Sequence, residues 1–207
     1  MIQKEKRFVC WMIIFFANPE WKYILEQLRA TNKPFKFKQG LDERLLTDEK
    51  CELLFSSKYD GDVTFAFDNI ADYDLIKRKL DMIRRHTTRQ CVFYVLTGFD
   101  YNNKYDKEFW YNDIVDTFRR IELLLKYGCV PYIMRFNKYE QSINRGMYIN
   151  LARWCNQPSF LKKKSFREFC TVESHIGKAT ERYLIDFLNR YPNFDERFLD
   201  MRFQNVI

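Results

Sequence analysis

The sequence is poor in glycine, proline and histidine. Among 207 residues there are 6 Gly, 5 Pro and 2 His. So few Gly and Pro argue against a loop-rich or low-complexity chain, and two histidines are too few for the usual zinc-finger ligand sets. Since no internal repeat or long linker is visible, we expect a globular domain with its own core and a small C-terminal addition.

Closely spaced cysteines are also missing. The nearest two of the six, Cys155 and Cys170, are 15 residues apart, which excludes CxxC and CxxxCxxC motifs. Several cysteines lie in apolar stretches such as "QCVFYVL", so we expect free thiols that act as small core residues. We therefore expect a reducing compartment, the cytoplasm, and no bound metal or cofactor.

The longest apolar run, in "FVCWMIIFFANPEW" (residues 8–21), has three interpretations. A bilayer span needs about 20 apolar residues, so the run is too short for one. A signal peptide fits badly, because Phe15 would occupy the −3 position of a cut after Ala17. Asn18 can cap a helix that has Pro19 at its first position. The pattern thus predicts a buried strand, covered on both faces, that leads into a helix.

Strand-like and helix-like segments then alternate along the chain. Further strands are predicted in residues 34–46, 62–68, 91–99 and 130–136, and helices in residues 48–56, 71–86 and 112–128, with Thr47 and Asn112 as N-caps and Gly128 as a left-handed stop. This order predicts an α/β fold with about five parallel strands and four crossover helices. Ser165 and Glu168 form a predicted capping box at the start of a C-terminal helical cap, residues 165–207, which continues with helices in 174–190 and 194–203.

The chain carries 35 Lys and Arg against 28 Asp and Glu, a formal charge of +7. This charge permits contact with nucleic acid or an acidic protein surface but does not require it. One basic run stands beside the aromatic residues Trp154, Phe160 and Phe166, an arrangement that can grip phosphates and stack bases. A solvated loop is the alternative interpretation. The residues of this run are Lys162, Lys163, Lys164 and Arg167.

A series of segments resembles a known family. The segments are "FFANPEWKYILEQL", "FKFKQGLDERLL", "DVTFAFD", "CVFYVLTGFD", "LLLKYGCVPYIMRFNK" and "LARWCNQPSFLKKKSFREF". In this order they look like successive strands and turns of a radical S-adenosylmethionine (SAM) enzyme, of a subgroup often found in phage and mobile elements. The likeness covers most of residues 8 to 170. It implies a truncated (β/α) partial barrel over residues 1–164, or an open parallel sheet.

The resemblance lacks the parts that carry the family's chemistry. The CxxxCxxC loop that holds a [4Fe–4S] cluster is absent, and the likeness begins at roughly the third barrel strand. Where the family tends to carry polar residues, this chain has Met12, Ile13 and Ile14. The opening strand would therefore be an apolar edge that needs a cover, which makes these three residues partner-binding candidates.

The strand ends supply the ligand-facing candidates. Asp42, Arg44, Asp68 and Arg135 lie near the carboxyl ends of predicted strands, where α/β folds bind ligands. In the intact family such places face SAM or substrate. Here the alternative is a vestigial polar network or a set of structural ion pairs, and we assign no catalytic residue.

Three functional hypotheses follow. The first is a non-catalytic radical-SAM-like remnant that binds a larger protein or ribonucleoprotein, for instance a phage or mobile-element inhibitor of a host nucleic-acid-targeting defence complex. The basic run and Met12 to Ile14 would then contact the partner, and direct contact with nucleic acid stays open. The second is the C-terminal half of a split radical SAM enzyme. The third is a cluster-free binder of SAM or a nucleotide. No membrane association is expected, and the oligomeric state stays open.

Overall fold

The computed structural model describes residues 8–10, 15–171 and 178–205, which form an α/β fold. The strands are β1 (Phe8–Cys10), β2 (Phe35–Phe37), β3 (Val63–Ala66), β4 (Cys91–Thr97) and β5 (Val130–Arg135). The α-helices are α1 (Trp21–Ala30), α2 (Asp48–Phe55), α3 (Tyr73–His86), α4 (Lys107–Lys126), α5 (Arg145–Cys155), α6 (Pro158–Leu161), α7 (Phe166–Cys170) and α8 (Lys178–Arg190). Short 3₁₀ helices are η1 (Phe15–Ala17), η2 (Glu43–Leu45), η3 (Ile70–Asp72), η4 (Asn137–Gln141) and η5 (Glu196–Asp200).

The strands form two parallel sheets instead of one sheet of five strands. β1 pairs with β2, and β3, β4 and β5 form a three-stranded sheet in that order. A single parallel bridge between Leu41 and Phe65 joins the segment after β2 to β3. The predicted α/β class with parallel strands is thus confirmed, whereas the predicted long strand over residues 34–46 is reduced to β2, because the chain turns into η2 after the bridge.

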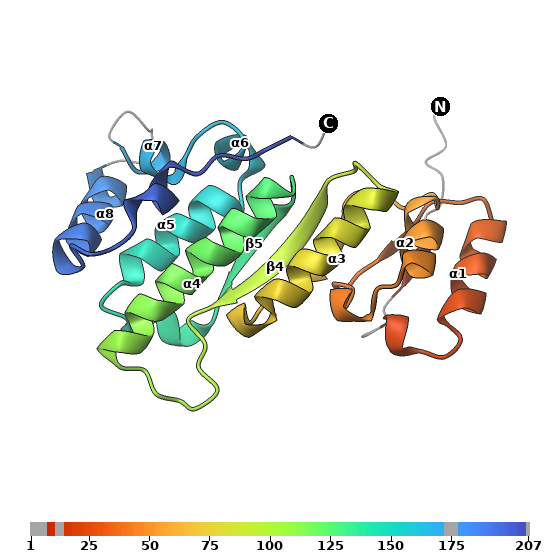
Figure 1. Cartoon of the computed structure of the whole chain (residues 1–207), viewed down its shortest axis with the longest axis horizontal. Helices are drawn as coiled ribbons and strands as arrows, with labels where there is room; N and C mark the ends of the chain where they lie inside the picture. The colour runs from red at the N-terminus through yellow and green to blue at the C-terminus, as the bar shows by residue number, and fades with distance from the viewer. Residues whose placement is uncertain (1–7, 11–14, 172–177, 206–207) are drawn as a thin grey trace.

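Helices cover one face of the three-stranded sheet. In Figure 1, α3 and α4 run across the front of the strands. Phe65, Phe93 and Val95 point into this layer and are fully buried. They meet the apolar side of α3, whose Ile76 and Leu80 are also buried. The core therefore lies between the sheet and this helical layer.

Several predicted helix ends are confirmed and others are wrong. The hydroxyl of Thr47 accepts a hydrogen bond from the backbone nitrogen of Lys50 at 3.3 Å, as a cap of α2 should. Asn112 does not cap α4, which begins at Lys107 with Asp106 as its N-cap. Asp106 caps the helix earlier, and Trp110 in the first turns is buried in the core, so α4 extends backwards and Asn112 lies inside it.

The predicted helix start near Pro19 is also shifted. α1 begins at Trp21, and the Asn18 side chain accepts a hydrogen bond from the backbone nitrogen of Glu20 at 2.9 Å, in a turn that precedes the helix. The apolar run contributes β1 and η1, and β1 has one paired neighbour, β2. Met12, Ile13 and Ile14 lie outside the described residues.

The C-terminal part packs beside α4 and α5 (Figure 1). The predicted capping box of Ser165 and Glu168 is present at the start of α7. α8 approaches α5 so closely that a Cβ atom on Gly146 would lie 2.2 Å from the Cγ atom of Tyr183. The last predicted helix is shorter than expected and forms the 3₁₀ helix η5. Within the described chain, no helix is long and apolar enough to span a membrane.

Candidate functional site

The second face of the three-stranded sheet is accessible. Side chains alternate along β4 between fully buried and half-buried, so only one face of this apolar strand is fully covered. On β5, Tyr132 and Met134 keep 43% and 44% of their surface exposed. Parallel register places residues of neighbouring strands side by side on this face. We call it the open face, formed by Thr64, Ala66, Val92, Tyr94, Leu96, Tyr132 and Met134.

Two tyrosines form the centre of the open face. The rings of Tyr94 and Tyr132 lie edge to face, with centroids 5.7 Å apart and planes at 73°. This is a favourable geometry for aromatic pairs and holds both rings in place. Leu96 and Met134 extend the apolar surface toward the carboxyl ends of the strands. The open face is therefore a partly ordered, apolar and aromatic surface.

An acidic pocket of about 630 Å³ adjoins the open face at the carboxyl end of β3. Ala66 lines it, and a Cβ atom on Gly40 would lie 3.4 Å from the Tyr94 ring, so these small residues leave the space open. Four carboxyl groups and one guanidinium line this pocket. They belong to Asp42, Glu43, Asp68, Asp72 and Arg44.

Glu43 is the buried member of this group, with 4% of its surface exposed. One carboxyl oxygen accepts a hydrogen bond from the backbone nitrogen of Ala66 at 3.2 Å. Burial, which disfavours the charged form, raises the pKa of Glu43 to about 7. A carboxyl group with such a pKa can take or release a proton near neutral pH, a property that is frequent at functional sites.

Three of the predicted ligand-facing residues lie in the acidic pocket. Arg44 donates two hydrogen bonds of 2.9 Å to the two carboxylate oxygens of Asp42, which lowers the pKa of Asp42. Asp68 is exposed, and its carboxylate accepts a hydrogen bond from the backbone nitrogen of Leu96 at 2.9 Å. The ion pair takes up one carboxylate, so the pocket keeps an excess of acidic groups.

The fourth predicted residue, Arg135, is separate. Its guanidinium lies over the ring of Tyr139, 4.6 Å from the centroid, and donates to the Tyr139 hydroxyl at 3.1 Å. It lines a different hollow together with Arg153 and Asn156. The structure thus brings Asp42, Arg44 and Asp68 together but not Arg135.

A buried arginine that the sequence analysis did not identify fixes the backbone next to the acidic pocket. Arg120 is 2% exposed and donates to the carbonyl oxygens of Phe67, Asp68 and Leu96 at 3.1, 2.8 and 2.9 Å. These carbonyls lie at the carboxyl ends of β3 and β4, so Arg120 ties the two strand ends together. Its charge also faces the buried carboxyl group of Asp113. Arg120 therefore holds in place the backbone that carries Asp68.

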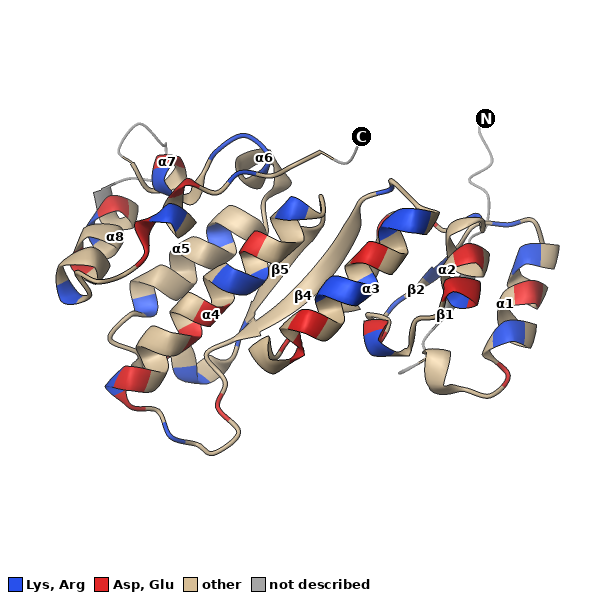
Figure 2. Cartoon of the chain, viewed as in Figure 1, with Lys and Arg blue, Asp and Glu red and all other residues tan. Residues whose placement is uncertain are grey.

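The basic lysine run lies at the surface after α6 (Figure 2). Lys162 and Lys163 are exposed and Lys164 is half-buried. The ammonium group of Lys162 lies 5.3 Å from the centroid of the Phe203 ring. These lysines are accessible to an anionic partner.

The neighbours of the lysine run do not fit a nucleic-acid grip. Arg167 forms ion pairs with Glu196 and Asp200, both at 2.9 Å, so its charge is balanced within the chain. Trp154 and Phe166 are fully buried and cannot stack on bases. The expectation of accessible aromatic rings is wrong at these two positions, because both rings belong to the core.

Five of the six cysteines are buried and have free thiols, as predicted. They are Cys51, Cys91, Cys129, Cys155 and Cys170. Over residues 8–10, 15–171 and 178–205, no group of three or more His, Cys, Asp or Glu side chains could hold a metal ion.

Comparisons with protein-family models, with curated proteins and with solved structures found no match. The site is therefore interpreted from its own geometry and chemistry.

Proposed function

We propose that this protein acts by binding a larger protein, alone or as part of a ribonucleoprotein, through the open face and the acidic pocket, and without turnover. The observation that carries the proposal is the exposure of Tyr132 and Met134 on a parallel sheet. Parallel sheets normally have both faces covered, because their strands are apolar on both sides. A partner that covers this face would complete the usual arrangement.

The chemistry of the open face favours a protein surface as its cover. Tyrosine and methionine are enriched in the cores of protein interfaces, where aromatic side chains supply much of the binding energy. The Tyr94–Tyr132 pair is already held in an edge-to-face geometry, which reduces the ordering cost on binding. Leu96 and Met134 add apolar area that is worth roughly 25 cal/mol per Å² removed from water.

The acidic pocket decides between protein and nucleic acid as the direct contact. A phosphate backbone that lay across the open face would approach Asp68 and Asp72, and like charges repel it. A lysine or arginine side chain of a partner protein would instead find acceptors in the pocket. We therefore assign the pocket to a basic side chain of the partner and the open face to its apolar neighbours.

We extend the proposal to the finer fold and to the origin of the chain. Parallel strands with helices along one face are the arrangement of a (β/α) barrel wall, and the open face would correspond to the inside of that barrel. The protein would then be a radical-SAM-like remnant without its cluster half. A phage or mobile-element inhibitor of a host defence complex is one instance, suggested by where the resembled subgroup occurs.

The meeting of Asp42, Arg44 and Asp68 in one pocket supports a second candidate. Ligands of α/β barrels bind at the carboxyl ends of the strands, where this pocket lies. A separate chain that carries the missing strands and a CxxxCxxC loop could cover the open face and complete a split radical SAM enzyme. A cluster-free SAM or nucleotide site would use the same pocket.

Capture from the producing cells with three tagged forms tests the proposal. The forms are the wild type, the double variant Tyr132→Glu/Met134→Glu, and the control Tyr23→Glu, whose side chain on α1 is 63% exposed. We expect one protein to co-purify near-stoichiometrically with the wild type and with Tyr23→Glu, and to be lost with the double variant. Equal capture by all three forms would show that the open face does not bind the partner.

The captured complex also separates the binding protein from the enzyme. We expect no consumption of SAM by the complex under anaerobic reducing conditions. Multiple turnovers of SAM, reduced by Asp42→Ala or Asp68→Ala, would establish the split enzyme instead. Loss of the captured protein after nuclease treatment would show that nucleic acid makes the direct contact.

A further inference from the structure

Two buried cysteines face each other at the amino ends of neighbouring strands. Cys91 is the first residue of β4, and Cys129 directly precedes β5. The register pairs Val92 with Val130, so Cys91 and Cys129 are the next pair in line. Neighbouring strands lie about 4.8 Å apart, a separation that a disulfide can bridge. Both thiols are fully buried.

A guanidinium group is fixed against one of the two sulfur atoms. Nη2 of Arg84 donates to Sγ of Cys129 at 3.1 Å. Other nitrogen atoms of Arg84 donate to the carbonyl oxygens of Tyr127 and Arg89, both at 2.8 Å. Arg84 therefore keeps its place at the end of α3 and presents a positive charge to the sulfur.

The surroundings give the two thiols different acidities. Burial opposes ionisation of Cys129, but the neighbouring thiol of Cys91 and the guanidinium of Arg84 outweigh it, and the pKa of Cys129 lies below its ordinary value. The hydrogen bond to Cys129 and burial raise the pKa of Cys91. In contrast, burial alone raises the pKa of Cys155. Cys129 is thus the more readily ionised of the two thiols, which suits it to be the attacking cysteine with Cys91 as the resolving one.

We propose that Cys91 and Cys129 form a peroxide-sensitive dithiol site that closes to a reversible disulfide. The Cys129 thiolate attacks one oxygen of hydrogen peroxide, the O–O bond breaks, and a sulfenic acid and a hydroxide ion form. The hydroxide takes the proton of Cys91 and leaves as water. The Cys91 thiolate attacks the Cys129 sulfur, an S–S bond replaces the S–O bond, and the departing hydroxide becomes water with the proton that Cys129 had released. The two sulfurs lose two electrons and the peroxide gains them.

The loop between α3 and β4 lies beside the site, and peroxide would reach the two thiols when this loop opens. Arg84 holds this loop through the carbonyl oxygens of Thr87 and Arg89 and is itself only half-buried. The site lies at the amino ends of the strands, whereas the acidic pocket lies at the carboxyl ends. The inference therefore does not rest on the proposed function.

Peptide mapping of the intact, folded protein after mild hydrogen peroxide treatment tests this site. We expect the protein to lose the mass of two hydrogen atoms, and a Cys91 peptide to be joined to a Cys129 peptide. Dithiothreitol should restore both thiols. Cys155, equally buried but without a basic partner, is the internal control and should stay reduced.

Two variants separate the role of Arg84 from simple proximity. Arg84→Gln should slow disulfide formation by roughly several-fold, because fewer Cys129 side chains are ionised, whereas Arg84→Lys keeps the charge and should slow it less. Oxidation of Cys155 as fast as Cys129, or oxidation of Cys129 to a sulfinic acid without a cross-link, would overturn the proposal. Peptide mapping of the wild-type protein tests the proposal even if neither variant folds.

Discussion

The side chain of Glu43 takes the place of a strand at the edge of β3. Its carboxyl oxygen accepts the hydrogen bond of the Ala66 backbone nitrogen, one residue beyond the bridge between Leu41 and Phe65. The chain leaves the sheet there to form η2, and the carboxyl group supplies the acceptor that the backbone no longer provides. A buried acid is thereby placed in the wall of the acidic pocket.

The burial of Glu43 predicts a pH-dependent stability. Its pKa is about 7 in the folded protein and about 4.3 in an unfolded chain. The folded state therefore holds more protons between these values, so the stabilisation is complete below about pH 4.3 and is lost as the pH rises to 7. We expect this side chain to account for a loss of about 3 kcal/mol, since one pKa unit corresponds to about 1.4 kcal/mol.

The variant Glu43→Gln isolates this contribution. Glutamine can still accept the hydrogen bond from Ala66 but does not titrate. The free energy of unfolding of both proteins is measured with urea at a series of pH values. As the pH rises to 7, the wild type should lose stability relative to Glu43→Gln. A difference that stays constant over this interval would mean that Glu43 titrates at an ordinary pKa.

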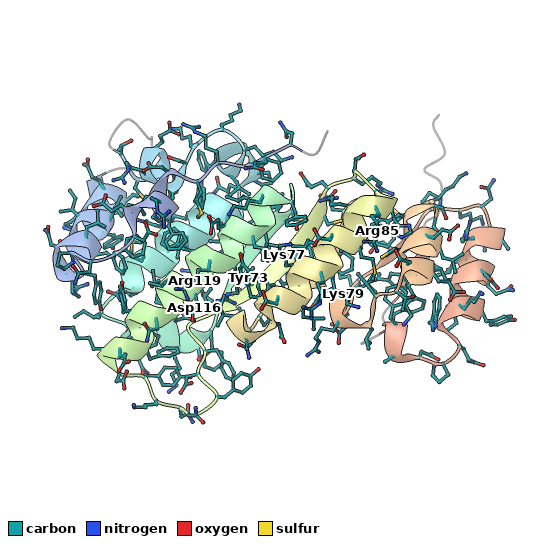
Figure 3. The ribbon with its side chains drawn as sticks, viewed as in Figure 1. Tyr73, Lys77, Lys79, Arg85, Asp116 and Arg119 are labelled. Carbon is teal, nitrogen blue, oxygen red and sulfur yellow. The ribbon has the colours of Figure 1, made fainter. Side chains whose placement is uncertain are left out.

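Arg120 and its sequence neighbour Arg119 offer a matched pair. Arg120→Ala removes the buried hydrogen bonds to three strand-end carbonyls and leaves the half-buried Asp113 without its cation, so we expect a loss of about 3–5 kcal/mol. Arg119 lies on the accessible side of α4 with Asp116 (Figure 3), and Arg119→Ala should change stability by less than about 1 kcal/mol. Chemical denaturation measures both, and equal effects would contradict the structural role of Arg120.

We predict that the lysine run attracts the partner electrostatically and contributes little to the stability of the folded protein. Reversal of charge at Lys162, Lys163 and Lys164 should leave the melting temperature nearly unchanged, because these side chains lie at the surface. Binding of the captured partner should weaken and depend less on salt if the partner presents an acidic or nucleic-acid surface there. Unaltered binding at low salt would remove the run from the interface.

The spacing of the cysteines predicts that the chain alone binds no [4Fe–4S] cluster. Such a cluster needs several thiolates that converge on one site, and three or more potential ligands do not converge anywhere in the described residues. Anaerobic reconstitution with iron and sulfide, followed by desalting, should leave no absorbance near ~400 nm, the region of iron–sulfur charge transfer. Iron retained at cluster stoichiometry and lost on cysteine substitution would refute this prediction.

Local signals made most of the fold predictable. Thr47 and Ser165 could be identified as caps from the sequence, because the partner of a cap lies only three residues further along the chain. Both hydroxyl groups accept a hydrogen bond from that backbone nitrogen. The helical spacing of Ile76, Leu80 and Ile83 in the sequence indicates one apolar side, and this side of α3 is buried. The covering of β4 could not be predicted in this way. Its residues are apolar on both faces, and such a pattern is the same whether the cover is a helix of this chain or another molecule.

The site was predictable only in part, because its decisive contacts are distant in the sequence. Asp42 and Asp68 were identified from their places after strands. Glu43 was missed, since its partner Ala66 is 23 residues away. The carbonyl partners of Arg120 lie 24 to 53 residues away, although Asp113, Thr117 and Arg120 recur at helical spacing beside the apolar stripe of α4. The helical spacing of these three polar residues was the one feature of the sequence that could have indicated the role of Arg120.

Titration calorimetry of the purified partner is the most direct test of binding through the open face. The account predicts that Tyr132→Glu/Met134→Glu weakens binding by about thirtyfold or more, since loss of even one central interface side chain costs about 2 kcal/mol. Tyr23→Glu should bind as the wild type does. Equal affinities of all three forms would contradict the account.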